Sequence, residues 1–139
     1  MARCDGQVRA VAKTEPKRNR ALLDMARGEG CLLRVPGVCT GDKATTVACH
    51  SNWAEHGKAG ARKADDCYSV WGCAACHQWL DQGKAHHQEK RRVWDGAFAW
   101  QRDIWIQITA GLLDATPKER KAAQWALDQL AATPKGAET

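Results

Sequence analysis

Residues 31–39 read CLLRVPGVC and residues 73–77 read CAACH, and these two stretches decide the fold of the chain. The second contains two cysteines separated by two residues, a spacing that lets one tight turn direct both thiolates at a tetrahedral ion. The first places its cysteines on either side of a Pro-Gly turn. Four thiolates complete a closed structural zinc site, so we predict that such a site is formed by Cys31, Cys39, Cys73 and Cys76. The alternative interpretation is a set of buried free thiols.

The compartment decides how these cysteines are interpreted. Seven cysteines in a short chain would suit a disulfide framework only in an oxidising compartment. Residues 1–20 contain no apolar stretch resembling a signal peptide, so we expect a cytoplasmic protein, in which clustered cysteines more often hold a metal. The run CAACH also matches the attachment pattern of c-type haem, but haem attachment requires export and makes no use of the upstream pair.

The segments around the cysteines predict an α+β fold. Short strands are expected at 45–50 and 67–72, joined by an exposed, glycine-rich and cationic loop at 51–66. One helix should begin at the second cysteine pair and end near Gly83, and a short helix over 20–27 should precede the first pair. The prediction is therefore a small zinc-bound core to which further helices are added at the C-terminal end.

The last third of the chain predicts two helices. Apolar residues recur at helical spacing over 89–113, and Thr116, Pro117 and Glu119 form a capping box with proline at the first helical position. The second of these helices should run to Leu130. We therefore expect three parts: a basic flexible arm at 1–20, a zinc-binding core at 21–95, and a helical extension at 96–139 that packs on the core.

Composition limits the partners of the chain. With 139 residues it suits one domain, and its net charge of +5 supports a nucleic-acid partner only weakly. Seven tryptophans stand against one phenylalanine and one tyrosine, and we expect them to pack in the interior. No segment approaches the roughly 20 apolar residues of a membrane-spanning helix, so we expect no membrane partner. The Trp-rich C-terminal helices could offer an apolar face to a second copy in a homodimer.

Two histidines flank the predicted zinc site. His50 ends the first predicted strand, and His77 directly follows the CxxC on the predicted helix. A zinc knuckle would hold the strand end and the helix start together, so both imidazoles could face one site. Asp81 lies one helical turn beyond His77 and could accept a hydrogen bond from it.

The order of these motifs resembles that of the HNH endonucleases. It runs Cys31…Cys39, then Val-Ala-Cys-His50, then a glycine-rich loop, then Cys73-Ala-Ala-Cys76-His77. The treble-clef or ββα-metal core of those enzymes carries two such cysteine pairs and a histidine at each of these places. More narrowly, four stretches resemble small nucleases encoded by phages and prophages: CLLRVPGVC, CHSNWAEHGKAG, RKADD and CAACHQWLD. The resemblance covers residues 20–83. It implies a metal-dependent endonuclease that hydrolyses DNA phosphodiester bonds in phage recombination or processing, in the cytoplasm of the bacterial host.

The resemblance also implies roles for individual residues. His50 would be the general base that activates water, and His77 a ligand of a catalytic divalent cation, which could be Mg²⁺, Mn²⁺ or Zn²⁺. The middle asparagine of the family has no clean match. Asp66 could take its place, either orienting His50 or binding the metal, and Asn52 is the other candidate.

Other positions leave alternatives open. Cys49 stands where many HNH enzymes have an acidic residue or histidine, so His50 could itself be a metal ligand, with His56 as an alternative base. In the loop, the DNA backbone could be held by Lys58, Arg62 and Lys63, although a solvated charged loop would look the same. The main rival function is a non-catalytic zinc-binding module for DNA or a protein partner.

Overall fold

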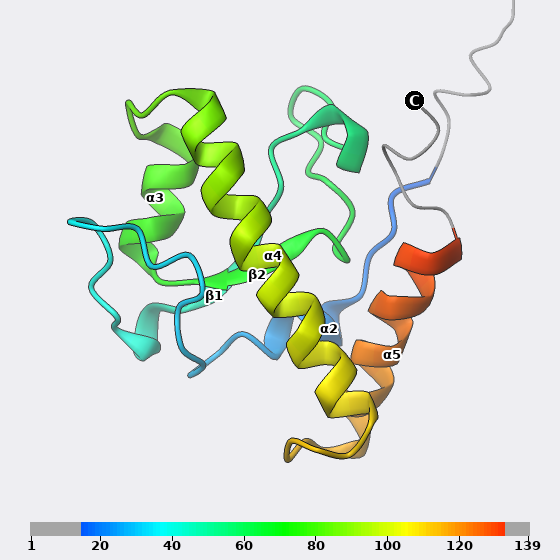
Figure 1. The fold of residues 1–139 in the computed structure, drawn as a ribbon. Helices are drawn as coiled ribbons and strands as arrows, with labels where there is room; N and C mark the ends of the chain where they lie inside the picture. Colours follow the sequence, from blue (N-terminus) through cyan, green and yellow to red (C-terminus); the bar gives the residue numbers. More distant parts are fainter. Residues whose placement is uncertain (1–14, 133–139) are drawn as a thin grey trace, which may run out of the picture.

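The structure is a computed structural model in which residues 15–132 are described. Within these residues, two strands and four α-helices pack as a mixed α+β fold (Figure 1). The strands are β1 (Val47–His50) and β2 (Ser69–Gly72). The helices are α2 (Arg20–Asp24), α3 (Ala74–Gln82), α4 (His87–Thr109) and α5 (Pro117–Ala132), with short 3₁₀ turns η1 (Lys43–Thr45) and η2 (Ala54–His56).

The two strands form an antiparallel pair in which Val47 lies opposite Gly72 and His50 opposite Ser69. All four residues of β2 are buried, because α4 runs across the sheet (Figure 1). Gly72 is required by close packing: a Cβ at this position would lie 2.7 Å from both the Cys49 Sγ and the Leu33 Cδ1. The 31–39 stretch is thereby pressed against the end of the sheet.

Aromatic side chains of α4 form the centre of the core. The rings of Trp94 and Phe98 stack with centroids 4.8 Å apart, and Trp105 meets Phe98 edge-on at 6.4 Å. Trp71 is buried as well. The prediction of interior tryptophans is wrong for Trp100, whose side chain is 41% exposed beneath the guanidinium of Arg34.

The C-terminal helices follow the predicted pattern. Thr116 and Glu119 exchange the two hydrogen bonds of a capping box, N to Oε1 at 2.9 Å and N to Oγ1 at 3.1 Å. The small side chains of Ala122, Ala123 and Ala126 are buried and allow α5 to approach α4 closely. The expected boundary between residues 95 and 96 falls inside α4, and the buried residues from α2 to α5 form one continuous cluster.

Two expectations need correction. The stretch 51–66 is not uniformly exposed: it contains η2, and its two ends are buried, including Ser51, Asp65 and Asp66. The end of the expected flexible arm packs on this stretch, because the Asn19 N–H donates to Asp66 at 2.7 Å. Residues 1–14 of that arm lie outside the described residues. Within 15–132, no helix combines the length and the apolar character needed to cross a bilayer.

Candidate functional site

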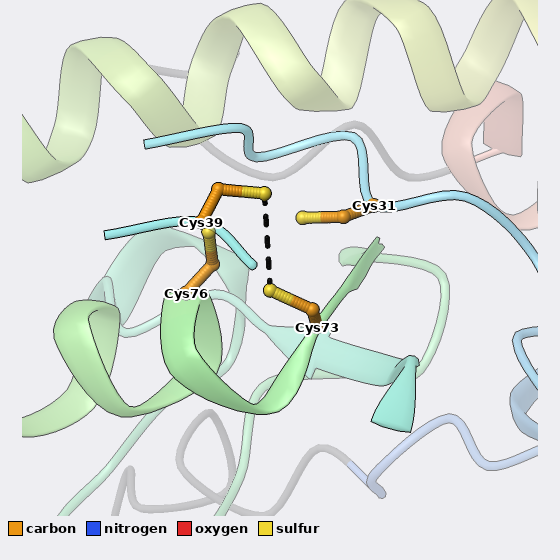
Figure 2. A group of neighbouring side chains, drawn as sticks. All are labelled: Cys31, Cys39, Cys73 and Cys76. Carbon is orange, nitrogen blue, oxygen red and sulfur yellow. Dashed lines mark hydrogen bonds between the residues drawn. The ribbon is translucent and has the colours of Figure 1, made fainter. Parts of the chain in front are cut away.

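The four predicted zinc ligands meet at one point (Figure 2). Their sulfur atoms all lie within 4.8 Å of one another, and the Sγ atoms of Cys39 and Cys73 are 3.9 Å apart. Tetrahedral zinc with Zn–S bonds of about 2.3 Å requires sulfurs about 3.8 Å apart. Cys73 caps α3 and Cys76 lies in its first turn, whereas Cys31 and Cys39 come from the 31–39 loop. The cluster could therefore hold a metal ion such as zinc.

Backbone N–H groups of the loop point at two of these sulfurs. The Arg34 N–H donates to the Cys31 Sγ at 3.5 Å, and the Val35 N–H donates to the Cys76 Sγ at 3.4 Å. Arg34 adopts a positive φ of 45°, which turns the chain tightly enough to present both donors. Such donors stabilise the negative charge of a thiolate, the form of cysteine that binds metal.

The thiol pKa values of Cys73 and Cys76 are shifted in opposite directions. Burial acts to raise the pKa of Cys73, but hydrogen bonds from Cys76 and Thr40 lower this pKa to about 6. Burial raises the pKa of Cys76 above its ordinary value, an effect that a bound cation would offset. Cys73 thus offers a thiolate near neutral pH.

A cavity of about 330 Å³ lies where the end of β1, the following loop and α3 meet. Both predicted histidines line it, as do two of the three predicted loop cations. Its lining is His50, Ser51, Asn52, Lys58, Lys63, His77, Asp81 and Gln82. Since His77 directly follows the cluster ligand Cys76 on α3, the cysteine cluster and the cavity share one helix.

His50 is held by a buried carboxylate. Its Nε2 lies 2.8 Å from the Asp66 Oδ1, with the side chains 13% and 2% exposed. Burial acts to raise the pKa of Asp66, but hydrogen bonds from His50 and the Asn19 backbone outweigh it and lower this pKa below its usual value. An ionised carboxylate only accepts hydrogen bonds, so the Nε2 of His50 is the donor in this contact. Of the two roles expected for Asp66, the geometry suits orienting His50.

His77 takes part in a second chain of contacts. Its Nε2 lies 3.1 Å from the Asp81 Oδ2, and the Asn52 amide donates to the Asp81 Oδ1 at 2.8 Å. The hydrogen bond to Asp81 raises the pKa of His77, and the same bond lowers the pKa of Asp81. The side chains of His77 and Asp81 are 40% and 39% exposed, so solvent reaches both.

His56 does not fit the role of an alternative base. Its side chain is buried, its Nδ1 lies 2.6 Å from the Ser51 Oγ, and its ring stacks on Tyr68 with centroids 4.2 Å apart. The imidazole thus belongs to the aromatic core and is not part of the cavity lining.

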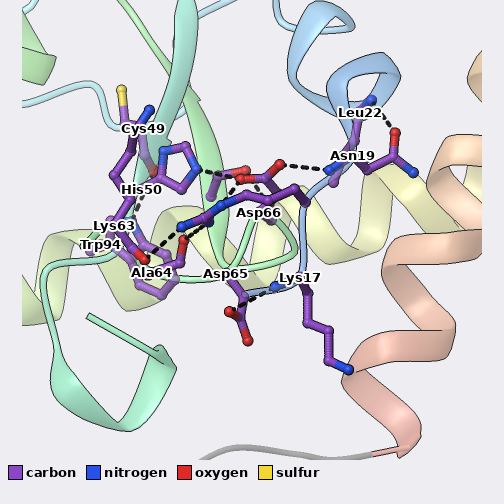
Figure 3. A network of polar contacts seen from close by, with 12 residues as sticks. Lys17, Asn19, Leu22, Cys49, His50, Lys63, Ala64, Asp65, Asp66 and Trp94 are labelled. Atoms are coloured by element: carbon purple, nitrogen blue, oxygen red, sulfur yellow. Dashed lines mark hydrogen bonds and ion pairs between the residues drawn. The ribbon is translucent and has the colours of Figure 1, made fainter. Parts of the chain in front are cut away.

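The cations of the site come partly from outside the loop. Lys58, which also donates to the Gly60 carbonyl, and Lys63 line the cavity, whereas Arg62 is outside the lining and pairs through its backbone with Ala59. Arg18 contacts Asp66 at 3.3 Å. Figure 3 shows Asp66 between His50 and Asn19. Arg18 could not be found from the sequence, because a contact between residues 48 positions apart leaves no local pattern.

Comparisons with known proteins identify the family of the chain. A family model described as "Putative nuclease YbcO" matches residues 20–108, more than half of the chain. Two relatives with this description, from Escherichia coli K12 and from Enterobacteria phage 82, are 37% identical over 57 residues, which is 41% of this chain. The chain spans 58% of the length of each.

A solved structure is also similar, that of "a putative bacteriophage protein" from Escherichia coli K-12, with 27% identity and a TM-score of 0.49. The match covers 64% of this chain and 98% of that one. The family model and both relatives are described as nucleases, and one of the relatives comes from a phage. By the family match, the chain belongs to the YbcO family. This confirms, at the level of the family, the resemblance to small phage nucleases.

Proposed function

We propose that the chain is a metal-dependent endonuclease of the HNH type that hydrolyses DNA phosphodiester bonds. The observation that carries the proposal is the cavity of about 330 Å³ in which His50 and His77 meet two lysines, each histidine already paired with a carboxylate. The family description supports nuclease activity. Paired histidines and carboxylates beside cations are the groups that phosphodiester hydrolysis needs.

The arrangement of elements supports a treble-clef scaffold. A loop with two cysteines is followed by an antiparallel pair, β1 and β2, and then by α3 with two cysteines at its beginning. Structural zinc on the four thiolates would tie the loop to the helix start. Zinc would thereby hold His77, the residue after Cys76, at a constant distance from the end of β1, where His50 lies.

In this proposal His50 is the general base. Its Nε2–H donates to Asp66, which leaves the Nδ1 to take a proton from the attacking water. Asp66 stabilises the imidazolium that forms, because its carboxylate is ionised and buried against the ring. This leaves orientation, not metal binding, as the role of Asp66.

His77 and Asp81 would hold the divalent cation. One imidazole and one carboxylate, each about 40% exposed, form a donor set that suits Mg²⁺ or Mn²⁺ and also Zn²⁺. When bound, such a cation supplies positive charge against the charge that develops on the phosphate. Asn52 keeps the Asp81 carboxylate oriented. Lys58 and Lys63 would bind neighbouring phosphates of the DNA backbone.

Phage DNA processing in the bacterial cytoplasm is the setting that the phage relative supports. The rival function is a zinc-binding module that binds DNA or a protein without cutting. A cleavage assay separates the two. Plasmid, nicked and branched DNA are incubated with Mg²⁺, Mn²⁺ or a chelator, and binding is measured at several salt concentrations.

We expect His50→Ala and His77→Ala to abolish cleavage and to retain salt-dependent DNA binding. His87→Ala is the matched control, because His87 is an exposed histidine on α4 outside the cavity. Cleavage that survives in the His77→Ala protein would refute the proposed site. A wild-type protein that binds DNA but cuts no substrate with any ion would favour the rival module.

A further inference from the structure

A short segment before α2 is attached to the strand-side wall of the cavity. The backbones of Lys17 and Asp66 pair, with the Asp66 N–H donating to the Lys17 carbonyl at 2.9 Å. The Asn19 N–H donates to the Asp66 Oδ2 at 2.7 Å, and the Lys17 N–H donates to Asp65 at 3.2 Å (Figure 3). Residues 17–19 precede residue 20, where the family match begins. The segment before α2 is thus tied to the wall that carries Asp66.

The guanidinium of Arg18 donates to three residues of the same wall, at positions 63, 64 and 66. One guanidinium nitrogen donates to the Ala64 carbonyl at 2.6 Å and to the Asp66 Oδ1 at 3.3 Å, and the other donates to the Lys63 carbonyl at 3.2 Å. The planar, forked guanidinium is suited to holding several acceptors in one geometry. One end of this stretch is Lys63 of the cavity lining, and the other end is the carboxylate that orients His50.

The Asp66 Oδ1 is shared between Arg18 and His50. Without the guanidinium, the buried carboxylate would keep its bonds to His50 and Asn19 but lose its ion pair with Arg18. The carboxylate and the His50 ring would then be less strictly held. A small misplacement of a base is costly, because proton transfer needs hydrogen-bond geometry.

We propose that Arg18 is a positioning residue: it holds Asp66, and through Asp66 the His50 imidazole, in the geometry of a general base. The inference rests on the proposed function for its kinetic consequence. The orientation of the His50 ring is a property of the chain by itself and can be measured separately.

The kinetic test compares Arg18→Ala, Arg18→Lys and Arg20→Ala in the full, zinc-loaded chain. Arg20→Ala is the matched control, because it removes the same charge only two residues further along the chain. The Arg20 side chain is mostly exposed, and among the described residues it pairs only with Asp24. We expect Arg18→Ala to lower kcat roughly tenfold at unchanged KM, the size of effect typical when a supporting partner of a site residue is lost. Arg18→Lys should fall between Arg18→Ala and wild type, because an ammonium keeps the charge without the fork.

A kcat of Arg18→Ala within twofold of wild type would overturn the proposal. So would a rise in KM alone, which would make Arg18 a DNA contact. If Arg18→Ala does not fold, Arg18→Lys is judged by the same two criteria.

The second readout does not depend on activity. The ring ¹⁵N and ¹H resonances of His50, assigned by their loss in His50→Gln, report its tautomer and its hydrogen bond to Asp66. We expect them to shift in Arg18→Ala and Arg18→Lys and to be unchanged in Arg20→Ala. Unchanged His50 resonances in both Arg18 variants would overturn the proposal even if the chain cuts DNA. Shifted resonances in a chain that cuts no DNA would retain the positioning role and refute the nuclease proposal alone.

Discussion

Replacing Asp66 by asparagine tests the network that orients His50. The carboxylate accepts hydrogen bonds at both oxygens, from His50 and Arg18 at one and from the Asn19 N–H at the other. An asparagine has one oxygen and one NH₂ group, so in either orientation its NH₂ faces a donor. At least one buried donor then loses its acceptor.

The expected cost follows from this count. Leaving one buried donor unsatisfied costs about 1–3 kcal/mol, and the partly exposed Arg18 adds little, so the free energy of unfolding should fall by about 2 kcal/mol. For a chain of this size that corresponds to a fall in Tm of roughly 6–8 °C. If His50 is the base, kcat should also fall roughly 10–100-fold.

The assay is thermal denaturation of the zinc-loaded proteins at pH 7, followed by circular dichroism. Asp24→Asn is the control, because Asp24 pairs with Arg20 and Arg27 at 3.8 and 3.6 Å on the surface, and its loss should cost less than about 1 kcal/mol. A Tm of Asp66→Asn within about 2 °C of the control would refute the reasoning, since a satisfied buried carboxylate cannot be neutralised without loss.

Three further predictions concern the scaffold and the second histidine. Cys73→Ser should lose bound zinc, measured by metal analysis of the purified protein, whereas Cys67→Ala should retain it; equal zinc contents would contradict the four-cysteine site. Gly72→Ala should destabilise the fold by about 1–3 kcal/mol in urea denaturation, because its Cβ would meet two side chains at 2.7 Å. A Cβ at Gly96 on α4 would have no atom within 4 Å, so Gly96→Ala should stabilise the fold by up to about 1 kcal/mol. A Gly96→Ala protein less stable than the Gly72→Ala protein would count against the packing described. The pKa of His77 is raised in the folded state by its carboxylate partner, so this pair contributes stability below the unfolded pKa of about 6.5 and loses it as pH rises through the folded pKa. The difference in unfolding free energy between wild type and His77→Gln should therefore be larger at pH 6 than at pH 8.5. The change should be less than about 1 kcal/mol, because the two side chains are 40% and 39% exposed. A difference that grows with pH would contradict this prediction.

Much of the fold could be predicted because its signals are local. The capping box at Thr116 and Glu119 forms as expected, and the predicted helix after the second cysteine pair is α3, which ends at Gln82. The predicted strand at 45–50 begins later, at Val47, because Lys43–Thr45 form a 3₁₀ turn capped by Asp42. Element ends are set by competing local hydrogen bonds, so they shift by a few residues more easily than the elements themselves.

By itself, the sequence determined the helices and strands, the cysteine cluster and the placement of His50 and His77 near one another. Turn chemistry, helical period and metal-ligand spacing act over a few residues and are written in the order of the chain. Helical spacing also predicted that Asp81 is the partner of His77, one turn away. Only the tertiary structure decided that Asp66, and not Asn52, lies against His50, and it brought Arg18 and Asn52 to the two carboxylates. Arg18 meets Asp66 across 48 positions, and Asn52 meets Asp81 across 29, and neither contact has a periodic or local signature. The burial of His56 was decided in the same way, by the packing of Tyr68 and Trp94 around it. Such contacts exist because distant segments share one core, and the sequence order of those segments does not specify how their side chains meet.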